Sequence, residues 1–163
     1  MHSFSQLIEV YIGRAYRIAF AVLGSRCDAE DAVQEACLRA VRCLNQLEQD
    51  DRFEFWFARI VANCSRNLLR RSKRRRAAGS VPVEEAANLL ANDGGVNSVE
   101  CSMDLRRCVS QLPELHRLVV HLHYAEELTT GEIAYVLSRP QGTIRRLLSE
   151  SYGMLRHSMR GNA

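Results

Sequence analysis

Residues 53–76 read FEFWFARIVANCSRNLLRRSKRRR, and this stretch decides the fold of the chain around it. Its apolar residues recur at steps of three and four, which is the spacing of one face of an α-helix. That face comprises Phe53, Trp56, Phe57, Ile60, Val61, Cys64 and Leu68. Because the aromatic rings keep the helical period, we expect them in a hydrophobic core rather than stacked on nucleic-acid bases.

The opposite face of the same helix carries amide and guanidinium groups, and the helix ends in a run of positive charge. The face comprises Arg59, Asn63, Arg66, Asn67 and Arg70, and the run comprises Arg70, Arg71, Lys73, Arg74, Arg75 and Arg76. A helix that is anchored by one apolar side and basic along the other is suited to lying against nucleic acid. The alternative is a core helix with a solvated basic end.

Charge falls into three blocks along the 163 residues, whose formal net charge is +3. Residues 1–76 carry +5, residues 77–104 carry −5 and residues 105–163 carry +3. Two basic blocks separated by an acidic one suggest two surfaces that contact a polyanion, joined by a segment that avoids it. Nearly all the positive charge is arginine, which suits bidentate contact with phosphate or guanine.

The composition favours a folded cytoplasmic protein with no chemistry of its own. No apolar run is long enough to cross a bilayer, and residues 1–25 lack the layout of a signal peptide. The six cysteines form no C-x-x-C pair and no cluster with zinc spacing, so we expect mostly reduced core residues, with redox sensing as the alternative. His116, His121 and His123 are also expected to be solvated or hydrogen-bonded rather than metal ligands. No catalytic pair or phosphate loop appears, so the sequence predicts neither an enzyme nor a cofactor.

Two further helices are predicted before the aromatic stretch. The first spans residues 4–23 and ends at Gly24, with an inward face of Leu7, Ile8, Tyr11, Ile12, Ala15, Ile18, Ala19 and Val22. The second starts near Asp28, whose carboxylate is predicted to cap backbone amides. It buries Ala29, Ala32, Val33, Ala36, Cys37, Ala40, Val41 and Leu44. Its dense acidic outer face either complements the helix dipole or meets a basic partner helix.

Two polar segments separate these helices from the rest of the chain. Residues 45–52 form a predicted loop, and residues 77–100 are acidic, rich in glycine and small residues, and typical of a linker. A short amphipathic turn is predicted in its EEAANLLA piece. A second helical block begins near Ser102, with an apolar side of Met103, Leu105, Val109 and Leu112 that stops at Pro113. Residues 114–124 are helical again, with the ring of Tyr124 predicted to face inward.

Residues 128–156, LTTGEIAYVLSRPQGTIRRLLSESYGMLR, contain the most specific signal. Thr129 and Glu132 form the T-x-x-E capping box of a short helix. Ser138-Arg139-Pro140 follows as a turn, and the next helix buries Ile144, Leu147, Leu148 and Leu155 while exposing Gln141, Thr143, Arg145, Arg146 and Ser149. This pattern predicts a helix-turn-helix whose second helix enters the major groove. The alternative is an ordinary helical hairpin.

The two helical blocks together resemble one family, the extracytoplasmic-function (ECF) sigma factors of bacterial RNA polymerase. DAEDAVQEACLRA resembles that family's acidic helix, FWFARIVANCSRNLLRR its W-x-x-R-I run, and LTTGEIAYVLSRPQGTIRRLL its helix-turn-helix. The resemblance implies an all-α fold of two small helical domains joined by a flexible linker. Residues 1–76 would be the region 2-like domain, residues 77–101 the acidic linker, and residues 102–163 the region 4-like domain.

The resemblance also implies partners and sites. Asp28, Asp31, Gln34 and Glu35 would bind the clamp helices of the largest subunit of core polymerase. Arg59, Asn63, Arg66, Asn67, Arg70, Arg71, Lys73 and Arg74 would bind the minus-ten element, with a flipped base near Asn63 and help from the loop 45–52. Gln141, Thr143, Arg145, Arg146 and Ser149 would bind the minus-thirty-five element, and an apolar groove of the second domain would hold the polymerase flap tip. An anti-sigma protein is an expected further partner.

The chain departs from the family pattern at several positions. Leu147, Glu150 and Tyr152 stand where the family usually has arginine after the turn, so minus-thirty-five binding is expected to be unusual or weak. Ala62 and Asn67 stand where arginine and aspartate are common. Two alternatives follow: a sigma-like decoy that captures an anti-sigma protein, or a stand-alone helix-turn-helix regulator that leaves the first block unexplained.

Overall fold

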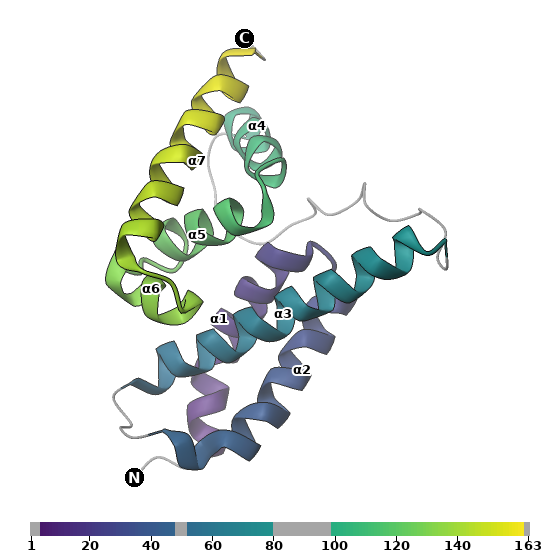
Figure 1. The fold of residues 1–163 in the computed structure, drawn as a ribbon, viewed down its shortest axis with the longest axis vertical. Helices are drawn as coiled ribbons and strands as arrows, with labels where there is room; N and C mark the ends of the chain where they lie inside the picture. The colour runs from purple at the N-terminus through teal and green to yellow at the C-terminus, as the bar shows by residue number, and fades with distance from the viewer. Residues whose placement is uncertain (1–3, 48–51, 80–98, 162–163) are drawn as a thin grey trace.

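The computed structural model describes residues 4–47, 52–79 and 99–161 (Figure 1). Over these ranges the chain is helical and contains no strand, which confirms the predicted all-α class. The elements are α1 (Phe4–Leu23), α2 (Arg26–Cys43), the 3-10 turn η1 (Leu44–Gln46), α3 (Phe53–Ala77), α4 (Val99–Ser110), α5 (Glu114–Tyr124), α6 (Thr130–Leu137) and α7 (Gln141–Gly161).

Helices α1, α2 and α3 pack against one another as the N-terminal unit. Gly24 has a φ of 66°, a left-handed conformation that glycine adopts without strain, and it ends α1 as predicted. The side of α2 that faces its neighbours consists mainly of small residues, which let the helices approach closely: Ala29, Ala32, Ala36 and Ala40. Phe53 and Phe57 fill the space between the helices from α3, with their rings 5.7 Å apart and stacked. The aromatic side of α3 is therefore core, as the helical period predicted.

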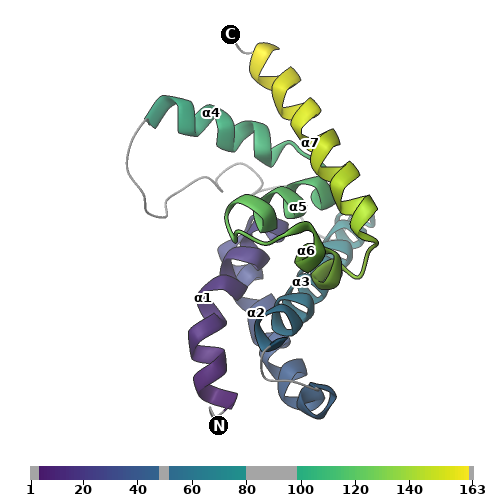
Figure 2. The same ribbon diagram turned by 90° about the vertical axis from the view of Figure 1, so that its left-hand side faces the viewer.

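Helices α4 to α7 form the C-terminal unit, in which α7 packs against α4, α5 and α6. Leu118, Leu122, Ile133 and Ile144 are fully buried at its centre. Helix α4 touches α7 and projects sideways from the rest of the unit (Figure 2). It begins at Val99, slightly earlier than the predicted start near Ser102.

The two units touch, with α6 lying on α3 and α5 lying on α1. Their buried residues form one continuous hydrophobic cluster rather than two. Figure 1 shows the C-terminal unit, in green and yellow, lying across the upper side of α3. The predicted turn in EEAANLLA and residues 48–51 of the predicted loop lie outside the described residues. Among the helices that the structure describes, none is long and apolar enough to span a membrane.

The start of α2 differs from the prediction. The helix begins at Arg26, and its N-cap is Ser25, whose hydroxyl accepts a hydrogen bond from the backbone N–H of Asp28 at 3.4 Å. Ser25 has the extended backbone that an N-cap requires, whereas Asp28 already lies in the first turn of the helix. Asp28 therefore complements the helix dipole instead of capping the helix.

Several residues predicted to be inward are exposed. The exposed fractions lie between 37% and 62% for six of them: Ile12, Val41, Leu44, Met103, Leu105 and Tyr124. Each lies on a helix whose apolar side extends beyond the part that neighbouring helices cover. Among the described residues, helix α2, for example, packs mainly against α1 and α3, and the side that carries Val41 stays largely exposed.

The five cysteines whose side chains are described are free. Cys64 and Cys108 are buried as predicted, while Cys27 is exposed. Burial raises the pKa of the Cys64 and Cys37 thiols, which keeps them protonated and unreactive near neutral pH. The side chain of Cys101 lies outside the described part of the chain.

We expect Ile18→Ala to lower the free energy of unfolding by about 2–5 kcal/mol, because Ile18 is fully buried between the helices and its removal leaves a cavity. The matched control is Val10→Ala on the same helix, where Val10 is 72% exposed; its effect should stay within about 0.5 kcal/mol. Urea denaturation followed by circular dichroism measures both. Equal losses in the two variants would contradict the assignment of the buried face of α1.

Candidate nucleic-acid interface

Helix α3 presents part of its predicted DNA-binding face to solvent. Asn63 is exposed, Asn67 is half-buried, and the basic run after Leu69 is exposed at Arg70, Arg71, Lys73 and Arg74. Because the aromatic side of the helix is fixed in the core, these groups are held on a rigid support. The exposed run is a positively charged surface of the kind that binds a phosphate backbone.

Two other residues of the predicted face, Arg59 and Arg66, contact the C-terminal unit. The Arg59 guanidinium lies 5.6 Å from the ring centroid of Tyr135 on α6, within cation–π range. The Arg66 Nε atom donates to Glu114 Oε1 of α5 at 2.8 Å, and both side chains are mostly buried. The arrangement therefore divides the predicted face into an exposed part and a part covered by α5 and α6.

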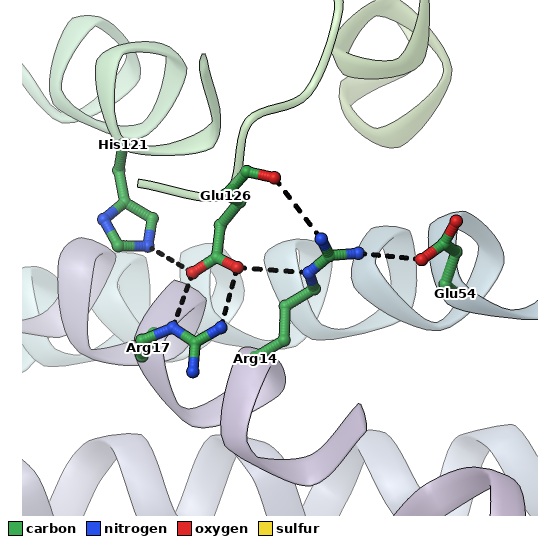
Figure 3. A network of polar contacts seen from close by, with 5 residues as sticks. All are labelled: Arg14, Arg17, Glu54, His121 and Glu126. Atoms are coloured by element: carbon green, nitrogen blue, oxygen red, sulfur yellow. Dashed lines mark hydrogen bonds and ion pairs between the residues drawn. The ribbon is translucent and has the colours of Figure 1, made fainter. Parts of the chain in front are cut away.

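A second polar contact between the units centres on Glu126, whose side chain is 1% exposed (Figure 3). Arg17 donates to both carboxylate oxygens, from Nε at 2.8 Å and from Nη2 at 2.9 Å. Arg14 donates from Nε to Glu126 Oε2 at 3.1 Å and from Nη2 to the Glu126 carbonyl at 3.3 Å. The Nη1 atom of Arg14 also donates to Glu54 on α3, so the network joins α1, α3 and the α5–α6 connection.

The charge of Glu126 is fixed by these contacts. Burial alone would raise the pKa of its carboxyl group, but the contacts with His121 and Arg17 outweigh burial and hold the pKa well below its usual range. His121 Nε2 lies 3.3 Å from Glu126 Oε1, an ion-pair distance when the ring is protonated. Glu126 is therefore ionised at neutral pH and bound by two arginines.

The predicted helix-turn-helix comprises α6, its turn and the start of α7. Thr129 accepts a hydrogen bond from the backbone N–H of Glu132, and the Glu132 carboxylate accepts one from the Thr129 N–H, which completes the predicted capping box. Ser138 ends α6 with a left-handed φ of 52°. The Pro140 carbonyl accepts from the backbone N–H groups of Thr143 and Ile144 in the first turn of α7, as expected if the proline opens that helix.

The solvent side of α7 carries the residues predicted to contact bases. Gln141, Arg145, Arg146 and Ser149 are exposed and Thr143 is half-buried. Gln141 Nε2 donates to Thr130 Oγ1 at 2.8 Å, which holds the first residue of α7 against the first residue of α6. The exposed residues recur along the first two turns of α7, so they share one side that a DNA groove can reach.

Two of the unusual residues after the turn have a structural role. Leu147 is buried, so it belongs to the core of the unit rather than to its outer face. Glu150 Oε2 lies 3.0 Å from His116 Nε2 and Glu150 Oε1 lies 3.6 Å from Arg146 Nε. The Glu150 carboxylate is thus shared between α5 and α7. The other two histidines also lie in polar contacts, since His123 Nδ1 donates to the Leu128 carbonyl and His121 faces Glu126.

The predicted polymerase-binding residues lie along α2. Asp31, Gln34 and Glu35 are exposed and Asp28 is half-buried. The bond from Arg39 to Glu35, at 2.8 Å, lowers the pKa of the Glu35 carboxyl group. Leu38 is 54% exposed and lies two turns after Asp31, so an apolar side chain sits within the acidic face.

Sequence reasoning missed Leu38 and the network around Glu126. Leu38 could have been found from its spacing to Asp31, because residues seven apart share a helix face. Glu126 and Arg14 are separated by 112 residues, and no local pattern links them. Over the described residues, no group of three or more His, Cys, Asp or Glu could hold a metal ion.

Two family models match the chain, in order and without overlap. The model described as Sigma-70 region 2 matches residues 7–75, and the model described as Sigma-70, region 4 matches residues 108–157. The first match covers α1 to α3 and the second covers most of the C-terminal unit, including its helix-turn-helix.

The chain is similar to several ECF RNA polymerase sigma factors. It is 26% identical to SigW of Bacillus subtilis over 97% of its own length and 89% of that protein. It is 31% identical to SigE of Mycolicibacterium smegmatis, over 96% of its own length and 61% of that protein. It is 32% identical to the sigma-E factor of Escherichia coli, over 72% of its own length and 66% of that protein.

Two solved structures share the fold. The sigma factor RpoE of Bartonella quintana, in complex with the anti-sigma factor NepR, superposes with a TM-score of 0.77 at 20% identity, covering 96% of each chain. CnrH, in complex with the cytosolic domain of CnrY, superposes with a TM-score of 0.67 at 21% identity, covering 98% of this chain and 89% of CnrH.

We expect Thr129→Ala to destabilise the C-terminal unit by about 1 kcal/mol, because it removes the side-chain half of the capping box on α6. Thr129→Ser keeps the hydroxyl and is the matched control, with little loss of stability. Urea denaturation monitored by circular dichroism compares the two variants. If serine costs as much as alanine, the hydroxyl does not stabilise α6.

Proposed function

The chain belongs to the sigma-70 family, as an RNA polymerase sigma factor of the ECF group, and on that premise we propose how its residues bind promoter DNA and core polymerase. A sigma factor directs promoter recognition and transcription initiation. In this proposal the N-terminal unit binds the minus-ten element and the C-terminal unit binds the minus-thirty-five element. The chain supplies contacts and no chemistry, and the polymerase supplies the catalysis in the cytoplasm.

The observation that supports this proposal best is the outer side of α7. Gln141, Arg145, Arg146 and Ser149 are exposed at the start of a helix that follows a capped short helix and a tight turn. Arginine can bond O6 and N7 of guanine and glutamine can bond adenine, so this side has the groups that major-groove recognition needs. Because Leu147 is buried, its replacement of a family arginine removes no group from this exposed side.

The minus-ten proposal rests on α3. Asn63 is exposed on a rigid helix and its amide both donates and accepts hydrogen bonds, as recognition of a flipped base requires. Flipping a base costs roughly a few kcal/mol, which contacts in the pocket and polymerase binding offset. Arg70, Arg71, Lys73 and Arg74 would bind the phosphates beside it, and Arg59, Arg66 and Asn67 complete the proposed set.

The polymerase contact is proposed on α2. Asp28, Asp31, Gln34 and Glu35 would meet the clamp helices of the largest subunit, and the exposed Leu38 adds apolar area within that face. A charged rim around an apolar side chain is common in protein interfaces. The exposed apolar residues of the C-terminal unit, which include Tyr152 and Met154, are the proposed contact for the flap tip.

An anti-sigma protein is a proposed further partner, because both structural neighbours were solved with a partner and the partner of RpoE is the anti-sigma factor NepR. The decoy and the stand-alone regulator are less well supported. The match to Sigma-70 region 2 accounts for the first block, which a lone helix-turn-helix regulator leaves unexplained.

Co-purification with bacterial core RNA polymerase, followed by genomic run-off transcription, tests the proposal. We expect a stable complex and new transcription start sites that depend on the added chain. A complex without start sites would support the decoy, and DNA binding without a complex would support the stand-alone regulator.

We expect the double substitution Arg145→Glu/Arg146→Glu to abolish promoter selectivity while polymerase binding persists. A bidentate base contact provides about 1–3 kcal/mol of discrimination, so run-off transcripts should fall by roughly tenfold or more. Arg156→Glu on the same helix is the control, because Arg156 is exposed but lies outside the first turns of α7. Initiation at the same start sites by the double variant would show that this side of α7 does not recognise the promoter.

We expect Asn63→Ala to impair open-complex formation more than initial DNA binding, with a cost of roughly 1–3 kcal/mol if Asn63 bonds a flipped base. Permanganate reactivity of the minus-ten region measures opening, and electrophoretic mobility shift measures binding. Gln111→Ala removes an exposed amide from the C-terminal unit and serves as the control. Unchanged permanganate reactivity in Asn63→Ala would exclude a role of Asn63 in melting.

A further inference from the structure

The contact between the two units occupies the same side of α3 that the minus-ten proposal needs. On α3, Arg59, Ala62 and Arg66 are spaced by three and four residues and therefore share one side of the helix. Ala62 lies roughly half a turn around the helix from Phe53, which packs in the core of the N-terminal unit. It is nevertheless only 1% exposed, because α6 lies on this side.

We propose that the docking of the C-terminal unit onto α1 and α3 is an autoinhibitory contact, latched by Glu126, that competes with promoter DNA for Arg59 and Arg66. The inference deepens the proposed function and rests on its assignment of the minus-ten surface to α3. The contact is made within one chain, so no partner is needed to form it.

The acidic groups of the C-terminal unit take the place of phosphates. Glu126 binds Arg14 and Arg17, and Glu114 binds Arg66, in each case through a carboxylate oxygen within 3.1 Å of a guanidinium nitrogen. A phosphodiester offers the same kind of oxygen acceptor to the same donors. DNA can therefore replace these carboxylates, but Arg66 cannot keep its bond to Glu114 and donate from the same Nε atom to a phosphate.

The size of residue 62 fits this arrangement. Alanine stands at position 62, between two arginines that contact the C-terminal unit. A long side chain at this point would lie where α6 approaches α3. The small alanine side chain allows the close approach of α6 and so favours the docked arrangement.

Arg117 of α5 fixes the position of the docked unit at the other end of the contact. Its Nε and Nη2 atoms donate to the carbonyls of Ala21 and Val22, at 2.8 and 3.1 Å, where the last turn of α1 leaves carbonyls without helical partners. Its Nη1 atom donates to the carbonyls of Ser110 and Leu112. The guanidinium therefore ties the end of α4 and the start of α5 to α1, and Glu114 is placed beside Arg66.

The contact covers only one of the two proposed DNA-binding surfaces. Arg145, Arg146 and Ser149 remain exposed while the units are docked. The docked chain thus keeps the groups proposed for the minus-thirty-five element and lacks part of those proposed for the minus-ten element. When the contact of Glu126 with Arg14 and Arg17 breaks, the proposed minus-ten surface on α3 also becomes accessible.

The test uses the full chain with Glu126→Gln, which keeps the shape of the side chain and removes its charge. Glu127→Gln is the matched control, because Glu127 is exposed and its substitution changes the net charge equally. Small-angle X-ray scattering measures the radius of gyration. Fluorescence anisotropy measures affinity for a fluorescein-labelled single-stranded 20-mer DNA of mixed sequence. We expect Glu126→Gln to enlarge the radius of gyration and tighten DNA binding by roughly tenfold, and Glu127→Gln to change neither.

A second variant, Arg17→Gln, removes the ion pair with Glu126 by a change on α1. The Arg17 side chain is 55% exposed, so this position tolerates substitution. An unchanged radius of gyration in both Glu126→Gln and Arg17→Gln would overturn the latch. A larger radius with unchanged DNA affinity would overturn the competition with DNA.

The double substitution Arg59→Ala/Arg66→Ala in the Glu126→Gln chain separates this inference from the proposed function. We expect it to abolish the gain in DNA affinity. If affinity stays high, α3 is not the DNA-binding surface, and both the minus-ten assignment and the competition fail. The radius of gyration still reports whether Glu126 holds the units together.

Discussion

The structure depends on α3 having a neighbour on two opposite sides. One side carries aromatic rings and is covered by α1 and α2, while the other carries Ala62 between two arginines and is covered by α6. A surface helix of a small bundle normally exposes the side opposite its apolar stripe. Here that side is partly buried, so both units share one continuous hydrophobic cluster. Any ligand of the covered side of α3 must compete with α6.

Electrostatic pairing contributes to how firmly the units are joined, because the carboxylate of Glu126 is buried at their contact. A buried carboxylate is costly unless it is paired and hydrogen-bonded. Glu126 is paired with two arginines, and its lowered pKa means that the contact is stabilised at pH values above the usual range of a carboxyl group. This stabilisation is lost only as the pH falls towards the lowered pKa of Glu126. Removing one partner of such a pair is strongly destabilising, because it leaves an uncompensated buried charge.

Helical spacing predicted most of the local structure, because each element is decided by residues a few positions apart. The capping box of Thr129 and Glu132, the end of α1 at Gly24 and the aromatic core side of α3 are of this kind. Errors arose where coverage by neighbours decides: Val41 and Tyr124, for example, continue an apolar stripe but remain more than half exposed. The contact around Glu126 joins residues more than 100 positions apart, so helical periodicity carries no information about it.

The internal ion pairs also determine which positive charges an approaching DNA molecule meets. Glu54, Glu114 and Glu126 bind Arg14, Arg66 and Arg17, so these guanidinium groups are largely neutralised by the chain itself. The exposed basic residues include the run at the end of α3, from Arg70 to Arg76, and Arg145 and Arg146 near the start of α7. Long-range attraction by a polyanion depends on accessible charge, not on the total number of arginines. In the proposed mechanism, first contact with DNA occurs at these two surfaces, and the arginines under α5 and α6 contribute only after the units separate.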